Sequence, residues 1–161
     1  MTCHARCVGN ARQASELPLI GLAMPLGTTM DHTVENLLMR NLLDVFGERD
    51  AAKRQSVIAA LWAADGVFAD PHGRYVGYAA INDAVSELYK KFPGFVFTPI
   101  GSPQTFFDVG RQAWGHGPVG EPPKVTGLDV VIARHGRIVS LYAFIDTPAL
   151  LTVGPADQRS A

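Results

Sequence analysis

Three segments in the first part of the chain repeat apolar residues every three or four positions, which is the pattern of amphipathic helices. We expect the first helix over residues 31–46 with Asp31 as its N-cap, and the second over 51–64 with Asp50 as its N-cap. The third is expected over 79–91, where a Phe-Pro-Gly sequence ends it. Each helix carries one apolar stripe, so all three are predicted to pack on a shared core.

Short runs of β-prone residues fill the rest of the chain. Two short strands lie between the second and third helices, on either side of a Pro-His-Gly turn, at 67–70 and 75–76. The later strands are expected at 95–100, 104–107, 112–117, 124–133 and 137–146. This order is typical of an α+β domain, in which the helices pack on one face of a curved, mostly antiparallel sheet.

The last two strands are predicted to form a hairpin across His135 and Gly136, and its register decides which residues share a face. A two-residue turn would pair Asp129 with Tyr142, whereas a three-residue turn would pair Asp129 with Leu141. We favour the longer turn, because a His-Gly pair suits a type I′ turn poorly. Whether Tyr142 shares the face of Asp129 depends on this register.

The length of 161 residues, with 47% hydrophobic residues, is enough for one domain with a substantial buried core. We expect this domain over residues 31–148, after a disordered leader at 1–30 and before a tail at 149–161. Both cysteines of the chain lie in that leader, so the domain has neither a disulfide framework nor a cysteine nucleophile. We expect no bound metal and no organic cofactor.

The charges of the chain nearly cancel, with 14 Lys and Arg against 15 Asp and Glu and a net charge of −1. This balance does not favour binding to nucleic acid or to an anionic membrane through bulk charge. The longest apolar stretch, residues 17–27, contains two prolines and is shorter than the ~20 residues of a membrane span. We therefore expect a cytoplasmic protein that acts on a small molecule.

Two acidic residues stand beside or within apolar strands. Asp70 ends a strand just before the Pro-His-Gly turn, where it is either a turn-initiating residue or an enclosed acid that moves protons. Asp129 lies inside the apolar strand at 124–133, where an acid is disfavoured unless it has a partner, a proton or water. The alternative for Asp129 is a solvent-facing position on a one-sided sheet.

Aromatic residues and a histidine complete the set of candidates. Trp62 closes the apolar stripe of the second helix, as a core residue or as part of a pocket. Trp114 and His116 alternate on one strand and therefore share a face, which forms either a pocket wall or a dimer surface. The sequence contains no phosphate-binding loop, nucleophile elbow or zinc-protease motif, so those functions lack support.

The segment 61–73, with the sequence Leu-Trp-Ala-Ala-Asp-Gly-Val-Phe-Ala-Asp-Pro-His-Gly, resembles the nuclear transport factor 2-like superfamily. The later Gly-Leu-Asp-Val-Val at 127–131 and His-Gly-Arg-Ile at 135–138 fit the same pattern. The most similar branches are ketosteroid isomerase and the SnoaL-like polyketide cyclases. The resemblance implies a cone-shaped α+β barrel with an apolar cavity between helices and sheet, and a homodimer formed through the sheet.

The resemblance also implies roles for the two acids. Asp70 matches the general base of the isomerase, and Asp129 matches the acid that donates a hydrogen bond to the substrate oxyanion, the arrangement for which that isomerase is the reference case. The isomerase carries a tyrosine on its first helix, where this chain has Leu42 or Phe46. Ile145 stands where the isomerase has a tryptophan.

The sequence thus predicts a small-molecule isomerase, cyclase or dehydratase that works beside a carbonyl group. Asp70 and Asp129 are the predicted catalytic residues. The predicted substrate-binding residues are Trp62, Leu88, Trp114, His116 and Tyr142. The alternative is a non-enzymatic member of the same fold that binds a small apolar ligand or forms a dimer, because one fold hosts many functions. A third hypothesis is a dehydratase that uses His116 with an aspartate.

Overall fold

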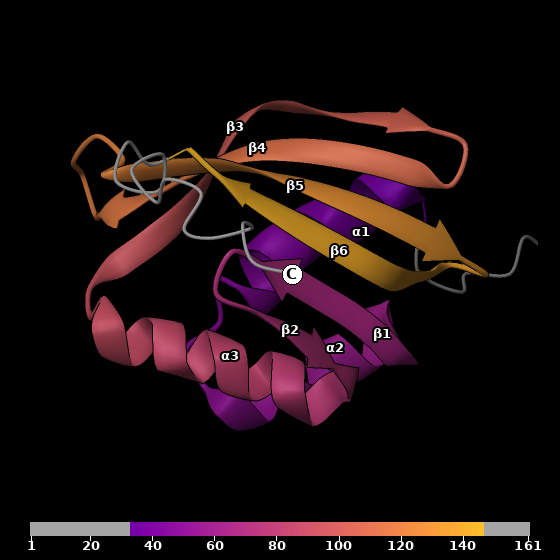
Figure 1. The fold of residues 1–161 in the computed structure, drawn as a ribbon. Coiled ribbons are helices and arrows are strands. Elements are labelled where there is room, and N and C mark those ends of the chain that lie inside the picture. The colour runs from indigo at the N-terminus through magenta and orange to yellow at the C-terminus, as the bar shows by residue number, and fades with distance from the viewer. Residues whose placement is uncertain (1–32, 147–161) are drawn as a thin grey trace, which may run out of the picture.

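The computed structural model describes residues 33–146, in which three helices pack on one six-stranded sheet (Figure 1). The predicted leader at 1–30, the Asp31 cap and the tail at 149–161 lie outside the described residues. The predicted α+β class is confirmed, with the helices in the first half of the chain and the longer strands in the second. No helix between residues 33 and 146 is long and apolar enough to cross a membrane.

The first helix, α1 (Val34–Arg40), begins at Thr33, whose hydroxyl accepts a hydrogen bond from the Asn36 amide. It passes without a break into a π-helical turn, η1 (Asn41–Val45), so the predicted apolar stripe runs through both. The third helix, α3 (Gly77–Lys91), begins two residues earlier than predicted and ends where expected.

The second helix, α2 (Ala51–Leu61), begins at Asp50 as predicted, but its predicted end at residue 64 is wrong. It ends at Leu61 because the next residue already belongs to a strand. The guanidinium of Arg137 donates hydrogen bonds to the carbonyl oxygens of Ala59 at 2.8 Å and Trp62 at 3.0 Å. A distant cation thus satisfies carbonyl groups that the last helical turn leaves without partners.

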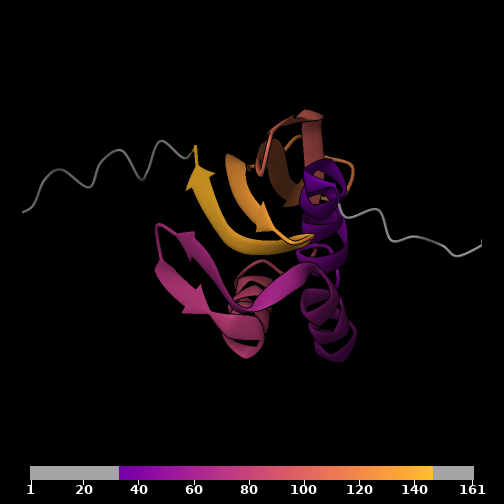
Figure 2. The same cartoon turned by 90° about the vertical axis from the view of Figure 1, so that its right-hand side faces the viewer.

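The sheet has the strand order β2-β1-β6-β5-β4-β3, and every neighbouring pair is antiparallel except β1 and β6. Its strands are β1 (Trp62–Asp70), β2 (Gly73–Val76), β3 (Phe95–Phe106), β4 (Val109–Pro118), β5 (Val125–Arg134) and β6 (Arg137–Ile145). The two strands predicted over 95–107 are one strand, with an irregularity between Ile100 and Gln104. The sheet curves strongly, as the bend of β5 and β6 in Figure 2 shows.

The helices divide the sheet between them. The helix α1 packs on β3, β4 and β5, whereas α3 packs on β1 and β2, and α2 contacts α3 and β1. The core between them is built from aliphatic residues and three large aromatic side chains, Phe46, Phe68 and Trp62. This division leaves space between α3 and the concave side of the sheet, where the candidate site lies.

The hairpin between β5 and β6 corrects the predicted register. Arg134 pairs with Arg137, so the turn has two residues, and both His135 and Gly136 have positive φ, at 51° and 71°. A bulge then shifts the pairing, and Asp129 lies opposite Ala143 rather than Tyr142 or Leu141. The favoured three-residue turn was wrong because His135 adopts the left-handed conformation.

Candidate active site

A cavity of about 790 Å³ is lined by residues from η1, α3 and all six strands. Both candidate acids, Asp70 and Asp129, line it. Most of the other lining side chains are apolar, and they include Leu42, Phe46, Phe68, Leu88, Phe97 and Ile145. The two acids therefore share one largely apolar enclosure, in which charges interact more strongly than in water.

Asp129 sits in the middle of β5 on its buried face and is only 6% exposed. The indole N–H of Trp114 on β4 donates a hydrogen bond to Asp129 Oδ1 over 2.7 Å. Trp114 can lie across β5 because Gly127 has no side chain there, and a Cβ at that position would lie 2.3 Å from Trp114 Cζ2. No residue that the structure describes forms a hydrogen bond with Asp129 Oδ2.

Burial raises the pKa of Asp129 from its usual value near 4 to about 7, and the hydrogen bond from Trp114 opposes that rise. The cause is desolvation, because an apolar wall disfavours the charged carboxylate. The acid form of Asp129 therefore persists to a much higher pH than that of an exposed aspartate. A carboxyl group in this state can both donate and accept a proton near pH 7.

Asp70 ends β1 and has a different environment. Its Oδ1 accepts hydrogen bonds from the backbone amides of His72 at 2.8 Å and Gly73 at 2.9 Å, which is the turn-initiating role considered from the sequence. Its Oδ2 lies 3.5 Å from Nδ1 of His72, and 17% of the side chain is exposed. Asp70 thus holds the β1–β2 turn with one oxygen while it also lines the cavity.

His116 lies two residues beyond Trp114 on the same face of β4, is 4% exposed and lines the same cavity. Its ring stacks on Phe97 with 4.3 Å between ring centroids, and the rings of Phe92 and Phe95 meet it edge-on. Burial, with a smaller effect of the Arg49 charge, lowers the pKa of His116 to about 4. The imidazole is therefore neutral at pH 7.

The predicted site residues separate into two groups. Leu88, Trp114 and His116 line the cavity with both acids. Trp62 does not: it is fully buried in the core, where its indole N–H donates to Asn41 Oδ1 over 3.0 Å. Tyr142 pairs with Val130 on the opposite face from Asp129 and is 43% exposed. The homodimer through the sheet stays a prediction.

Tyr75 is a cavity residue that sequence reasoning missed. It lies on β2, stacked on Phe68, and burial with the nearby charge of Asp70 raises the pKa of its hydroxyl. The group is therefore protonated at neutral pH. Its sequence signal was its place two residues after the turn glycine at 73, where a hairpin sets it opposite Phe68.

The positions that the resemblance assigned to the tyrosine of the isomerase, Leu42 and Phe46, both line the cavity. Neither side chain carries a hydroxyl, so the polar groups of the cavity come from other residues. Among the residues from 33 to 146, no group of three or more His, Cys, Asp or Glu side chains is placed to hold a metal ion. The described cavity offers the carboxyl groups of Asp70 and Asp129, the neutral imidazole of His116 and the phenol of Tyr75, and its lining also includes His72, Asp83, Glu87 and Lys91.

Three helices packed on a strongly curved, mostly antiparallel six-stranded sheet form the architecture of the nuclear transport factor 2-like superfamily. The chain belongs to the SnoaL-like domain family, whose family model matches residues 39–141. None of the curated proteins that were compared with it matches its sequence.

Solved structures show the same fold. A proposed isomerase of the SnoaL-like family from Agrobacterium tumefaciens is 25% identical, with a TM-score of 0.65 over 69% of this chain and 95% of that one. A proposed polyketide cyclase from Sinorhizobium meliloti is 19% identical, with a TM-score of 0.52 over 67% and 93% of the two chains. A proposed ketosteroid isomerase from Kribbella flavida is 16% identical, with a TM-score of 0.54 over 78% and 84%.

Proposed function

We propose that this protein catalyses proton transfer next to the carbonyl group of a small apolar molecule, in an isomerase- or cyclase-like reaction. The observation that carries the proposal is Asp129: a buried carboxyl group with a pKa near 7 lines an apolar cavity together with a second acid, Asp70. General acid–base catalysts work best when their pKa lies near the operating pH. The names of the similar structures point to the same reaction class.

In the proposed reaction Asp70 is the base and Asp129 is the acid. The carboxylate of Asp70 removes a proton from the carbon beside the carbonyl, and the electron pair moves onto the carbonyl oxygen. Protonated Asp129 donates a hydrogen bond to this enolate oxygen. Asp70 then returns the proton to another carbon, so that an isomerisation completes with no net gain or loss of protons.

The surroundings of the two acids support these roles. Trp114 fixes Asp129 Oδ1, which leaves Oδ2 to meet the substrate oxygen. The backbone amides of the β1–β2 turn hold Asp70 Oδ1, so the oxygen that would take the substrate proton is Oδ2, which lies 3.5 Å from His72 Nδ1. Leu88 and Trp114 contribute apolar surface to the cavity that would enclose the substrate ring.

The proposal is tested by following the exchange of protons beside a ketone for deuterium, using acetylnaphthalene in D₂O and NMR detection. We expect Asp129→Asn and Asp70→Asn each to lower the enzyme-dependent exchange rate by roughly 10²–10⁴-fold. The Asn side chain at 70 keeps an oxygen for the two turn amides, so the fold is retained. The matched control is Asp65→Asn, an exposed acid on the same strand, β1. Exchange at the wild-type rate in both site variants would contradict the proposal.

A non-enzymatic ligand-binding domain is the second candidate function. It is favoured by the two hydrogen bonds that Asp70 Oδ1 accepts from backbone amides of the β1–β2 turn, because a purely structural role of Asp70 explains them. Under this alternative the ketone raises the melting temperature of the protein, yet no deuterium exchange exceeds the rate in buffer. The same two measurements therefore decide between catalysis and binding.

A further inference from the structure

The turn between β3 and β4 exposes two phenylalanines. Phe106 pairs with Val109, so Phe107 and Asp108 form a two-residue turn. Phe106 is 73% exposed and Phe107 is 88% exposed, and their rings lie edge to face with 4.6 Å between the centroids. Large apolar groups that gather on a surface mark a place that another molecule or segment covers.

The backbone of this turn makes a phenylalanine at position 107 still more unusual. Phe107 has a φ of 51°, in the left-handed region. A turn position with positive φ favours glycine or asparagine, because the Cβ of a bulky residue crowds the backbone there. At 88% exposure the ring also gains little packing from residues 33–146. The folded domain therefore does not explain this residue, whereas a contact made from outside the domain does.

A groove of about 280 Å³ adjoins the turn, and its lining is mostly apolar and includes Phe106, Val109 and Val130. Gly110 also lines the groove, and a Cβ on it would lie 2.7 Å from Cγ1 of Val34, the first residue of α1. Figure 1 shows the β3–β4 turn and the start of α1 at the same end of the sheet. We call the two phenylalanines and this groove the apolar tip. The chain thus enters the described domain beside the apolar tip.

The sequence just before α1 contains a segment that suits this surface. Residues 17–27 read Leu-Pro-Leu-Ile-Gly-Leu-Ala-Met-Pro-Leu-Gly and include no charged residue. Large apolar residues stand at every second position from Ile20 to Leu26, so an extended segment would present them on one face. Only residues 28–32 separate the segment from Thr33, a link that spans at most about 20 Å. So short a tether gives an effective concentration that is roughly millimolar, at which weak apolar contacts are enough for docking.

We propose that residues 17–27 dock on the apolar tip of their own chain and cover its exposed phenylalanines. Docking removes apolar surface of both partners from water, which drives the contact. The occupant is this segment and not a second copy, because its tether begins beside the groove. The inference does not depend on the proposed function, since none of the residues of the apolar tip lines the cavity that holds Asp70 and Asp129.

The test uses the full chain with a nitroxide spin label at Gly21→Cys, which lies between the large residues of the segment. Cys3→Ser and Cys7→Ser remove the native cysteines, which are the only two in the chain. NMR then measures how fast the label relaxes the backbone amide protons of residues 104–111. This paramagnetic relaxation falls steeply with distance, so we expect it to be strong at the apolar tip.

Two further variants of the labelled protein separate docking from mere proximity. Ile20→Asp combined with Leu22→Asp puts two charges into the apolar contact, and the relaxation rate at residues 104–111 should fall roughly threefold or more. The matched control is Thr28→Asp combined with Thr29→Asp, which puts the same charges into the link and should keep the rate of the labelled parent.

The surface is tested by Phe106→Ser combined with Phe107→Gly. The relaxation rate should fall as far as in the charged segment, while the melting temperature is maintained, because both side chains are mostly exposed and glycine suits the turn. Weak relaxation in the labelled parent, or the same rate in every variant, would overturn the proposal. Labelled chains mixed with unlabelled, ¹⁵N-enriched chains identify a second copy: relaxation at residues 104–111 of the enriched chains would overturn the assignment of the tip to the chain's own segment.

Discussion

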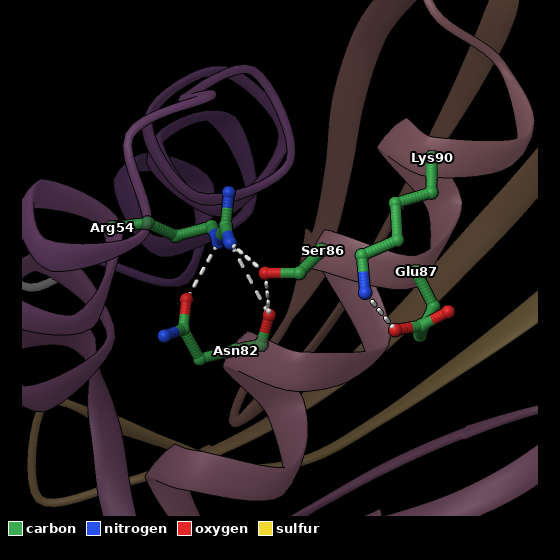
Figure 3. Close-up of polar contacts among 5 residues, drawn as sticks. All are labelled: Arg54, Asn82, Ser86, Glu87 and Lys90. Atoms are coloured by element: carbon green, nitrogen blue, oxygen red, sulfur yellow. Dashed lines mark hydrogen bonds and ion pairs between the residues drawn. The ribbon is translucent and has the colours of Figure 1, made fainter.

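Two of the regions in which the described chain buries polar side chains satisfy them to different degrees. Between α2 and α3, the fully buried guanidinium of Arg54 makes five hydrogen bonds to five oxygen atoms. They come from the carbonyls of Glu48 and Arg49 and from Asn82 and Ser86 of α3, which Figure 3 shows on one side of Arg54. None of the five is a carboxylate oxygen, so the direct hydrogen bonds to this buried cation all come from neutral groups, while the charges of nearby acids such as Glu48 and Asp50 favour it without a direct bond.

The cavity wall on β4 and β5 is satisfied less completely. Asp129 has one hydrogen bond, to Trp114, and His116 has a buried nitrogen with no partner in the described chain. Both regions are conformationally fixed by regular secondary structure, so looseness does not explain the difference. A polar group whose bonds are all made inside the protein holds the fold together, whereas one with a bond left open can meet a ligand.

The largest expected effect follows from replacing Arg54, the buried cation whose hydrogen bonds are all made within the protein. Arg54→Met leaves the half-buried amide oxygen of Asn82 and carbonyl of Glu48 without their donors. We expect the free energy of unfolding to fall by about 3–5 kcal/mol, because each stranded acceptor costs about 1–3 kcal/mol and packing is also disturbed. Urea unfolding followed by circular dichroism measures this loss.

The matched control for that variant is Lys53→Met, which removes an exposed cation one residue earlier on the same helix. Its stability should stay within about 0.5 kcal/mol of the wild type. Equal losses in the two variants would mean that the hydrogen bonds of Arg54 do not stabilise the interface between α2 and α3.

In the cavity, replacing the buried polar residue Asp129 is expected to raise the free energy of unfolding instead of lowering it. The folded state raises the pKa of Asp129 to about 7, so folding binds a proton that the unfolded chain releases at lower pH. Stability is therefore lost as pH rises from near 4 to about 7, by about 1.4 kcal/mol per unit, and the loss levels off above the folded pKa. Asp129→Asn abolishes this loss and should be more stable than the wild type by about 2–4 kcal/mol at pH 8.

Thermal unfolding of both proteins between pH 5 and pH 8 measures the difference. The gap in stability should widen with pH and then become constant. A variant that is more stable but loses deuterium exchange shows that its lost activity does not come from unfolding. A gap that stays constant over the whole range would mean that Asp129 is ionised in the folded protein at every pH tested.

The sequence predicted the elements of this comparison unevenly. Apolar periodicity located all three helices, and an acid inside an apolar strand singled out Asp129, because burial of a charge is a strong local signal. The length of α2 was misjudged because Arg137, far along the chain, satisfies its last carbonyl groups. Trp62 consequently begins a strand instead of continuing the helix, and it enters the core, which is one of the two positions that the apolar stripe had left open.

The faces of the last hairpin show a second limit. A bulge of one residue in β6 decides that Ala143 and not Tyr142 shares the face of Asp129. Such a bulge depends on packing across several strands and leaves no clear mark in the local sequence. The bond between Trp114 and Asp129 was likewise hidden, since it requires the space above Gly127 on the neighbouring strand.

The space above Gly127, which the indole of Trp114 occupies, leads to a third prediction. In Gly127→Ala the new Cβ would lie 2.3 Å from Trp114 Cζ2 and 2.4 Å from the carbonyl oxygen of Phe144, so the indole must move. We expect a loss of about 1–3 kcal/mol in stability and a changed near-UV circular dichroism spectrum. The control is Thr126→Ala, the preceding residue of β5, which should leave the spectrum unchanged. An unaltered spectrum in Gly127→Ala would show that Trp114 does not depend on the glycine.

The smallest expected effect comes from removing the single hydrogen bond of the cavity acid. In Trp114→Phe the indole N–H that favours the carboxylate form of Asp129 is lost, so the pKa of Asp129 rises further, by about half a unit to one unit. Because protonated Asp129 is the proposed donor, deuterium exchange falls as pH increases through this pKa, and the variant should keep its activity to higher pH. Trp62→Phe is the control, since Trp62 donates its hydrogen bond to Asn41 in the core. This variant should leave unchanged the pH at which the exchange rate falls. If the exchange rate of Trp114→Phe falls at the same pH as that of the wild type, a group other than Asp129 controls the pH dependence.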